Sequence, residues 1–250
     1  MNTNKLIVAL DVDNAQRARE LVAALRGVVG MFKIGLQLFT AAGPSLVREI
    51  ISSDERVFLD LKYHDIPNTV ACAGVEATRL GVSIFNLHAL GGNEMMQRTA
   101  DAVSGCAQAE GFTRPLVIAV TVLTSANENT LRDVGYHAAP GALVPRLALL
   151  AEASGMDGVV ASPREVGTIR SVVKNKNFVV VTPGIRPQGT DLRDQKRVTT
   201  PREAVLAGAD YIVVGRPILD APDPVHAARQ VLEEMESGAA DSVMIEGNRS

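Results

Sequence analysis

One stretch near the amino terminus decides the fold: Leu6-Ile7-Val8-Ala9-Leu10-Asp11-Val12-Asp13-Asn14. It begins with an uninterrupted aliphatic run, which is typical of a parallel strand buried on both faces. An open, doubly wound sheet would be expected to carry a glycine-rich dinucleotide turn after its first strand. An acidic segment without glycine follows Leu10 instead. This difference favours a closed α/β barrel over the open sheet.

Aliphatic runs and helical patterns alternate along the rest of the chain. The expected strands are Leu6–Leu10, Met31–Gly35, Val57–Leu61, Val82–Leu87, Leu116–Thr121, Gly158–Ala161, Phe178–Thr182 and Tyr211–Gly215. The expected helices are Ala15–Leu25, Pro44–Ile51, Val70–Leu80, Asn93–Ala107, Leu143–Ala153, Arg164–Val173, Pro201–Ala207 and Pro224–Met235. This alternation predicts parallel pairing and a (β/α)8 TIM barrel in a single domain over residues 1–236. We expect residues 237–250 to form a poorly ordered C-terminal tail.

Charge and cysteine content argue against several classes of protein. The formal net charge of −3 lacks the basic excess of a nucleic-acid binder, so a local site would have to hold any phosphate. Cys72 and Cys106 have no metal-ligand spacing and suit reduced thiols in the cytosol. The amino-terminal segment lacks a signal-peptide pattern, and no apolar run approaches the roughly 20 residues that span a bilayer. We therefore expect a soluble, cytoplasmic protein that binds neither nucleic acid nor membrane.

The first three expected strands end in charged residues, namely Asp11, Lys33, Asp60 and Lys62, with Asp65 following in the next loop. Active sites of α/β barrels lie at the carboxyl ends of the strands. Because side chains alternate along a strand, Asp60 and Lys62 should point the same way, towards the barrel mouth. Ordinary surface ion pairs would explain one such pair. Surface ion pairs explain less well why several charged residues are expected together at the mouth of one barrel.

Glycine and arginine follow the last two strands. Strand seven leads into Thr182-Pro183-Gly184-Ile185-Arg186-Pro187, and strand eight leads into Val214-Gly215-Arg216-Pro217-Ile218. Barrels often bind phosphate with the loops after strands 7 and 8, through backbone N–H groups near glycine. Arginine adds charge-assisted contacts. These loops predict a phosphate site, and the long loop over residues 184–198 is expected to be a lid.

The run Val57-Phe58-Leu59-Asp60-Leu61-Lys62-Tyr63-His64-Asp65-Ile66-Pro67-Asn68-Thr69 resembles the D-x-K-x-x-D-I-P-x-T signature of the orotidine 5′-phosphate decarboxylase family. The resemblance extends to Leu10-Asp11, to Phe32-Lys33-Ile34-Gly35, and to the T-P-G-I-R-P and V-G-R-P-I segments. It covers the chain from about residue 5 to residue 235. It implies removal of CO₂ from orotidine 5′-monophosphate to give UMP, the last step of de novo pyrimidine biosynthesis, by a homodimer without cofactor or metal.

The resemblance also implies roles for individual residues. Lys62 would donate the proton to C6 of the pyrimidine, flanked by Asp60 and Asp65. Asp65 and Thr69 would reach into the neighbouring subunit's site. Asp11 and Lys33 would hold the ribose hydroxyls and continue the alternating charge chain, Thr124 would contact the pyrimidine, and Pro183 is expected to contact the substrate. Gln195, Gly215 and Arg216 would bind the phosphate, and Arg186 would close over it from the lid.

Two alternatives stay open from the residues alone. Mg²⁺-dependent keto-sugar-phosphate decarboxylases and hexulose-phosphate synthases resemble the same segment, but they carry a glutamate on strand two where this chain has Lys33. His64 and His88 follow strands three and four and could form a metal pair, although polar packing is the commoner role of such residues. The second alternative is a non-catalytic nucleotide-binding barrel, which fold alone does not exclude.

Overall fold

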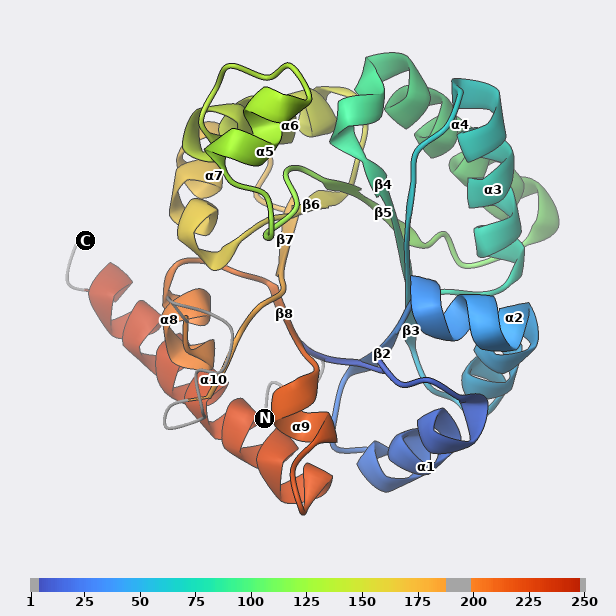
Figure 1. The fold of residues 1–250 in the computed structure, drawn as a ribbon, viewed down its shortest axis with the longest axis vertical. Helices are drawn as coiled ribbons and strands as arrows, with labels where there is room; N and C mark the ends of the chain where they lie inside the picture. Colours follow the sequence, from blue (N-terminus) through green and yellow to red (C-terminus); the bar gives the residue numbers. More distant parts are fainter. Residues whose placement is uncertain (1–4, 188–198, 248–250) are drawn as a thin grey trace.

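The computed structural model describes residues 5–187 and 199–247. Its strands close into a parallel barrel in which each strand pairs with the next along the chain and β8 pairs with β1 (Figure 1). The strands are β1 Leu6–Ala9, β2 Met31–Gly35, β3 Val57–Tyr63, β4 Ile84–His88, β5 Leu116–Val120, β6 Gly158–Val160, β7 Val179–Thr182 and β8 Tyr211–Val214. The predicted closed (β/α)8 barrel is confirmed.

The helices form a ring around the outside of the barrel (Figure 1). They are α1 Ala15–Leu25, α2 Leu36–Ser52, α3 Pro67–Arg79, α4 Gly92–Glu110, α5 Glu128–Asp133, α6 Pro140–Ala153, α7 Val166–Val172, α8 Pro201–Leu206, α9 Arg216–Leu219 and α10 Pro224–Gly247, with 3₁₀ turns η2 Ala89–Gly91 and η3 Pro163–Glu165. Side chains cap several of them. The Asn14 side chain accepts a hydrogen bond from Arg17 N at the start of α1, and a capping box starts α8 at Thr200.

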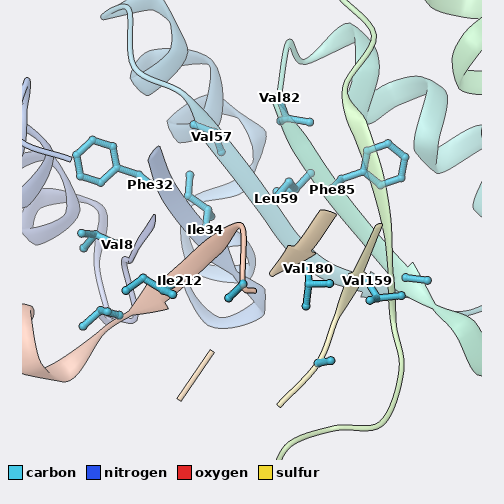
Figure 2. Packing of buried hydrophobic residues seen from close by; sticks show 14 of the residues in the cluster. Val8, Phe32, Ile34, Val57, Leu59, Val82, Phe85, Val159, Val180 and Ile212 are labelled. Carbon is cyan, nitrogen blue, oxygen red and sulfur yellow. The ribbon is translucent and has the colours of Figure 1, made fainter. Parts of the chain in front are cut away.

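Alternation along the strands divides the apolar residues into two cores. The barrel interior is filled by Ile7, Ala9, Met31, Phe58, Ile84, Ile118, Val181 and Val213. The neighbouring residues of the same strands, such as Val8, Leu59 and Ile212, belong to the larger core that the strands share with the helices (Figure 2). Because every second residue faces inward, Asp60 follows Phe58 on the interior side of β3. The apolar interior thus ends in charge at the carboxyl end of the barrel.

Several element boundaries differ from the sequence-based expectation. The expected second helix begins at Pro44, whereas α2 begins at Leu36 and is broken at Gly43, where φ is 67°. Proline is favoured in the first turn of a helix, so the pattern reveals only the part after the break. The alternation also does not predict α5 and α9. Their 6 and 4 residues are too short to show a helical period.

The last helix is longer than the sequence predicts. Its expected end is Met235, but α10 continues through the described part of the predicted tail to Gly247. Two contacts fix the added turns against α8. The Asp241 carboxylate accepts from Arg202 at 2.6 Å, and a Cβ at Gly238 would lie 2.7 Å from the carbonyl oxygen of Arg202. The predicted helix end is therefore wrong, because tertiary contacts outweigh the polar, glycine-containing composition.

No helix within residues 5–187 and 199–247 has both the length and the hydropathy needed to cross a bilayer.

Candidate active site

Four charged side chains meet at the carboxyl ends of β1, β2 and β3 in an alternating series. Lys33 Nζ lies 3.0 Å from Asp11 Oδ1 and 3.2 Å from Asp60 Oδ2. Lys62 Nζ lies 2.6 Å from Asp60 Oδ1. The side chains of Lys33 and Asp60 are only 10% and 12% exposed, so each needs an opposite charge nearby. The structure thus places together the four charged residues that the sequence singled out at the strand ends.

These charges line one side of a cavity of about 430 Å³ at the barrel mouth. Residues of the segments that follow β7 and β8 also line it. Nine of the residues singled out from the sequence line this cavity: Asp11, Lys33, Asp60, Lys62, Thr124, Pro183, Arg186, Gly215 and Arg216. A single cavity therefore contains both the alternating charges and two arginines.

The segment after β7 reaches the cavity through a sharp turn. Gly184 has a φ of 77°, in the left-handed region that favours glycine. Beyond it, Arg186 N donates to Thr199 O at 3.2 Å, which joins the two sides of the gap between the described residues. Gln195 and most of the predicted lid, residues 188–198, lie outside the described residues.

Asp65 and Thr69 do not line the cavity of this subunit. Both are exposed, and Asp65 Oδ1 accepts a hydrogen bond from the Ile66 backbone N–H at 2.6 Å. Ile66 is itself 66% exposed, which is high for a large apolar side chain. The two residues therefore stand apart from the other predicted site residues and belong to an outward-facing surface after β3.

The backbone at Lys62 is strained. Its φ is 52°, a left-handed conformation that costs an L-amino acid roughly 1–2 kcal/mol. Register between β3 and β4 shifts at the same place, since Leu59 pairs with Phe85 but Tyr63 pairs with Leu87. Strain of this kind persists only where surrounding contacts impose it, and it is frequent at functional sites.

Sequence reasoning missed two residues that support the charges. Asn86 on β4 is fully buried; its Nδ2 donates to Asp60 Oδ1 at 2.7 Å, and its Oδ1 accepts from Lys62 N at 2.8 Å. A lone amide in the apolar run of β4 was the available signal. Gly35 leaves space for the neighbouring ammonium, because a Cβ there would lie 3.0 Å from Lys33 Nζ.

The two histidines considered as a metal pair stack beside the site. The rings of His64 and His88 are 5.3 Å apart between centroids and tilted by 34°. Burial, followed by the charges of His64 and Lys62, lowers the pKa of His88 below its usual value, so its imidazole is neutral at pH 7. The residues that the structure describes include no group of three or more His, Cys, Asp or Glu side chains suited to a metal ion.

This arrangement has a defined chemical capacity. A fixed ammonium at Lys62 can stabilise negative charge that develops on a bound ligand, and it can deliver a proton to the same atom. One oxygen of Asp60 forms an ion pair with the Lys62 ammonium, and the other oxygen forms an ion pair with Lys33. The arginines across the cavity can hold an anionic group remote from this centre. The site can therefore grip a phosphorylated molecule at one end and stabilise a carbanion at the other.

Comparisons with known proteins agree with this geometry. The model of the Orotidine 5′-phosphate decarboxylase / HUMPS family matches residues 4–231. The chain is 54% identical over 231 residues to an orotidine 5′-phosphate decarboxylase of Syntrophotalea carbinolica, covering 92% of this chain and 94% of that protein. It is also 54% identical over 234 residues to the Geobacter sulfurreducens enzyme of that name, covering 94% and 97%.

Solved structures give the same result. The crystal structure of orotidine 5′-phosphate decarboxylase from Lactobacillus acidophilus superposes with a TM-score of 0.82 at 36% identity, covering 92% of this chain and 98% of that one. The corresponding structure from Pyrococcus horikoshii gives a TM-score of 0.74 at 25% identity, covering 92% and 99%. Similarity thus extends over almost the whole of each chain.

Proposed function

This chain belongs to the orotidine 5′-phosphate decarboxylase / HUMPS family, and from that premise we propose that it converts orotidine 5′-monophosphate to UMP and CO₂. It is a carboxy-lyase of pyrimidine biosynthesis, acting at the last de novo step. The observation that carries the proposal is the alternating array Asp11–Lys33–Asp60–Lys62 in a cavity that also contains Arg186 and Arg216. We propose one catalytic domain, which continues beyond the predicted limit at residue 236 because α10 packs against α8 after that point.

Lys33 favours this reaction over the Mg²⁺-dependent branch of the family. Its ammonium lies between Asp11 and Asp60, at 3.0 Å and 3.2 Å from their carboxylate oxygens. A divalent cation bound by those oxygens would lie against a like charge, which costs free energy. The keto-sugar-phosphate enzymes have a glutamate here, which would instead attract the metal. The proposed reaction therefore proceeds without metal or organic cofactor.

The reaction breaks the bond between C6 and the carboxylate carbon, and the bonding electrons stay on C6 as CO₂ leaves. That electron pair lies in the plane of the pyrimidine ring, where the π system cannot delocalise it. The Lys62 ammonium stabilises it and then donates the proton that completes UMP. Asp60 fixes that ammonium at 2.6 Å. Repulsion between Asp60 and the substrate carboxylate also raises the free energy of the bound ground state.

The remaining residues of the cavity bind the unreactive parts of the nucleotide. Asp11 and Lys33 hold the ribose hydroxyls, Thr124 and Pro183 contact the base, and the phosphate binds at Gly215, Arg216, Gln195 and Arg186. Binding energy gained at the phosphate drives closure and presses the pyrimidine against the charge array. A remote group thereby contributes to the rate of the chemical step.

We further propose a two-fold homodimer with its active sites at the interface. Asp65 and Thr69 are exposed and lie outside the cavity of their own subunit, and the neighbouring Ile66 is 66% exposed. An isologous contact over this surface would bury Ile66 and bring Asp65 to the partner's cavity. The enzyme is expected to work in the cytoplasm, where Cys72 and Cys106 remain reduced thiols.

The direct test of function is the absorbance change as orotidine 5′-monophosphate becomes UMP. We expect full turnover by the purified protein in excess EDTA, because the mechanism uses only side chains. A product assay that detects UMP and CO₂ in equal amounts completes the measurement. Turnover that EDTA abolishes and Mg²⁺ restores would assign the chain to the metal-dependent branch, and binding without turnover would indicate a nucleotide sensor.

Arg216→Ala is expected to lower kcat/KM by about a hundredfold or more, equivalent to roughly 3 kcal/mol of transition-state binding. The reason is the loss of a charge-assisted contact to the phosphate at the cavity wall. Arg98→Ala is the matched control, because Arg98 pairs with Glu94 on the exposed face of α4. Steady-state kinetics of both variants make the comparison. Unchanged kcat/KM in Arg216→Ala would remove this residue from the phosphate site.

A further inference from the structure

The Asn86 side chain makes two hydrogen bonds to β3, one to Lys62 and one to Asp60. Its Oδ1 accepts from the backbone N–H of Lys62 at 2.8 Å, and its Nδ2 donates to Asp60 Oδ1 at 2.7 Å. The same Asp60 oxygen accepts from Lys62 Nζ at 2.6 Å. These contacts close a ring through Asn86, Lys62 and Asp60. The Asn86 amide thus contacts both the backbone of Lys62 and the Asp60 carboxylate that pairs with the Lys62 ammonium.

The backbone of β3 needs such a contact at this point. Between the pairs Leu59↔Phe85 and Tyr63↔Leu87, β3 advances four residues while β4 advances two. The extra residues bulge out of the ladder, and Lys62 adopts a φ of 52°. Asn86 lies between Phe85 and Leu87 on β4, the strand without the extra residues. Its side-chain oxygen replaces the backbone acceptor that Lys62 N–H would have in a regular ladder.

Only an amide satisfies both partners. Lys62 N–H requires an acceptor, which fixes the orientation of the Asn86 side chain and leaves its NH₂ group facing Asp60. Leucine has a similar size but offers neither group. Aspartate would offer the acceptor, but it would place a second carboxylate beside Asp60. Since Asn86 is fully buried, water cannot replace a lost partner without rearrangement.

We propose that Asn86 is a positioning residue that sets the angle and distance of the Lys62 ammonium relative to Asp60 and thereby its aim at the reacting carbon. The inference rests on the proposed decarboxylase function. It concerns the chemical step, because Asn86 is not among the residues that line the cavity and its side-chain hydrogen bonds go to Lys62 and Asp60. Loss of Asn86 should therefore lower kcat and leave nucleotide binding nearly intact.

The test compares Asn86→Leu and Asn86→Asp with the wild-type enzyme. We expect kcat to fall by about 10- to 100-fold in both, as for a lost hydrogen bond to a charged group. The Kd for UMP, measured by titration calorimetry, should change by less than about threefold, because its binding contacts remain. Asn86→Asp keeps the shape and the acceptor for Lys62 N–H, so it reports the loss of the donor to Asp60 together with the added negative charge beside it, and it covers the case in which Asn86→Leu fails to fold.

Thr78→Val is the control for a purely structural effect. Thr78 is also fully buried, and its hydroxyl donates to Gly74 O at 2.9 Å inside α3. We expect this variant to lose thermal stability and keep the wild-type kcat. A wild-type kcat in Asn86→Asp, or an equal loss of kcat and of UMP affinity in both Asn86 variants, would overturn the inference.

Failure of the proposed function gives a different result. In that case the wild-type protein itself shows no turnover of orotidine 5′-monophosphate. The inference is then decided by a crystal structure of Asn86→Leu or of Asn86→Asp. If Lys62 Nζ keeps its 2.6 Å contact with Asp60 Oδ1 and Lys62 keeps its left-handed φ, Asn86 does not position the pair. Displacement of either one supports the inference independently of activity.

Discussion

Lys62→Ala is expected to lower kcat for decarboxylation by about ten thousandfold or more, because one substitution removes both the proposed stabilising charge and the proposed proton donor. We expect the variant to remain folded and to bind UMP. Asp60 keeps its contacts with Lys33 at 3.2 Å and with Asn86 at 2.7 Å, so the carboxylate is not left alone. Absorbance kinetics and calorimetry with UMP measure the two properties. Lys176→Ala, at an exposed lysine before β7, is the control.

Appreciable turnover by Lys62→Ala would refute the proton-donor role. The same variant also tests the shared site. Lys62→Ala and Asp65→Ala subunits, each inactive alone, should recover about a quarter of the wild-type sites after mixing and reassociation, since half of the dimers are mixed and each has one intact site. If Asp65 served the cavity of its own subunit, every mixed site would lack one residue and activity would not return.

Asp60→Asn should show the second largest effect, with kcat lower by about a thousandfold. Asparagine keeps the shape but removes the charge that Lys33 and Lys62 share at 3.2 Å and 2.6 Å. Lys62 then loses its paired carboxylate and Lys33 keeps only Asp11, at 3.0 Å, so the free energy of unfolding should fall by about 3 kcal/mol. Chemical denaturation measures the stability, and steady-state kinetics measure kcat.

A matched aspartate at the opposite end of the barrel separates these two losses. Asp157 accepts from Arg114 at 2.8 Å and from Val117 N at 2.7 Å, before β6. Asp157→Asn therefore also weakens a charged network, and we expect it to reduce stability with kcat unchanged. If both variants lost kcat in proportion to stability, the effect of Asp60 on the rate would reflect folding alone.

The fold was accessible from the sequence because its strands are continuous aliphatic runs. The buried stretch beginning at Leu6 and the missing glycine turn after it decided between barrel and open sheet. Local patterns did not show where tertiary contacts override propensity. The turns of α10 after Met235 depend on Arg202, which is distant in sequence, and the early part of α2 is hidden by its break at Gly43.

The site, like the fold, could be predicted from the sequence only in part. Strand parity alone indicated that Asp60 and Lys62 face one cavity, and the structure places both on its wall. Family resemblance supplied the role expected of Thr124, which spacing could not, whereas the loops after strands 7 and 8 already predicted a phosphate site at Arg186 and Arg216. Asn86 escaped notice because its importance comes from the irregular register opposite Lys62, and register is set by the whole sheet. The proposed role of Asp65 could not be read from one chain, because it requires the proposed homodimer.

The apolar packing inside the barrel has a consequence for proton supply. Ile7, Met31, Phe58 and Ile84 are at most 2% exposed and close the floor beneath the charged residues. In the part of the chain that the structure describes, the reaction chamber is thus a well with one opening. In the proposed mechanism, the proton that Lys62 gives up in each cycle has to be replaced from bulk water through that opening, the same one through which nucleotides would pass. Reprotonation of Lys62 and exchange of the product for substrate would therefore share one opening of the cavity.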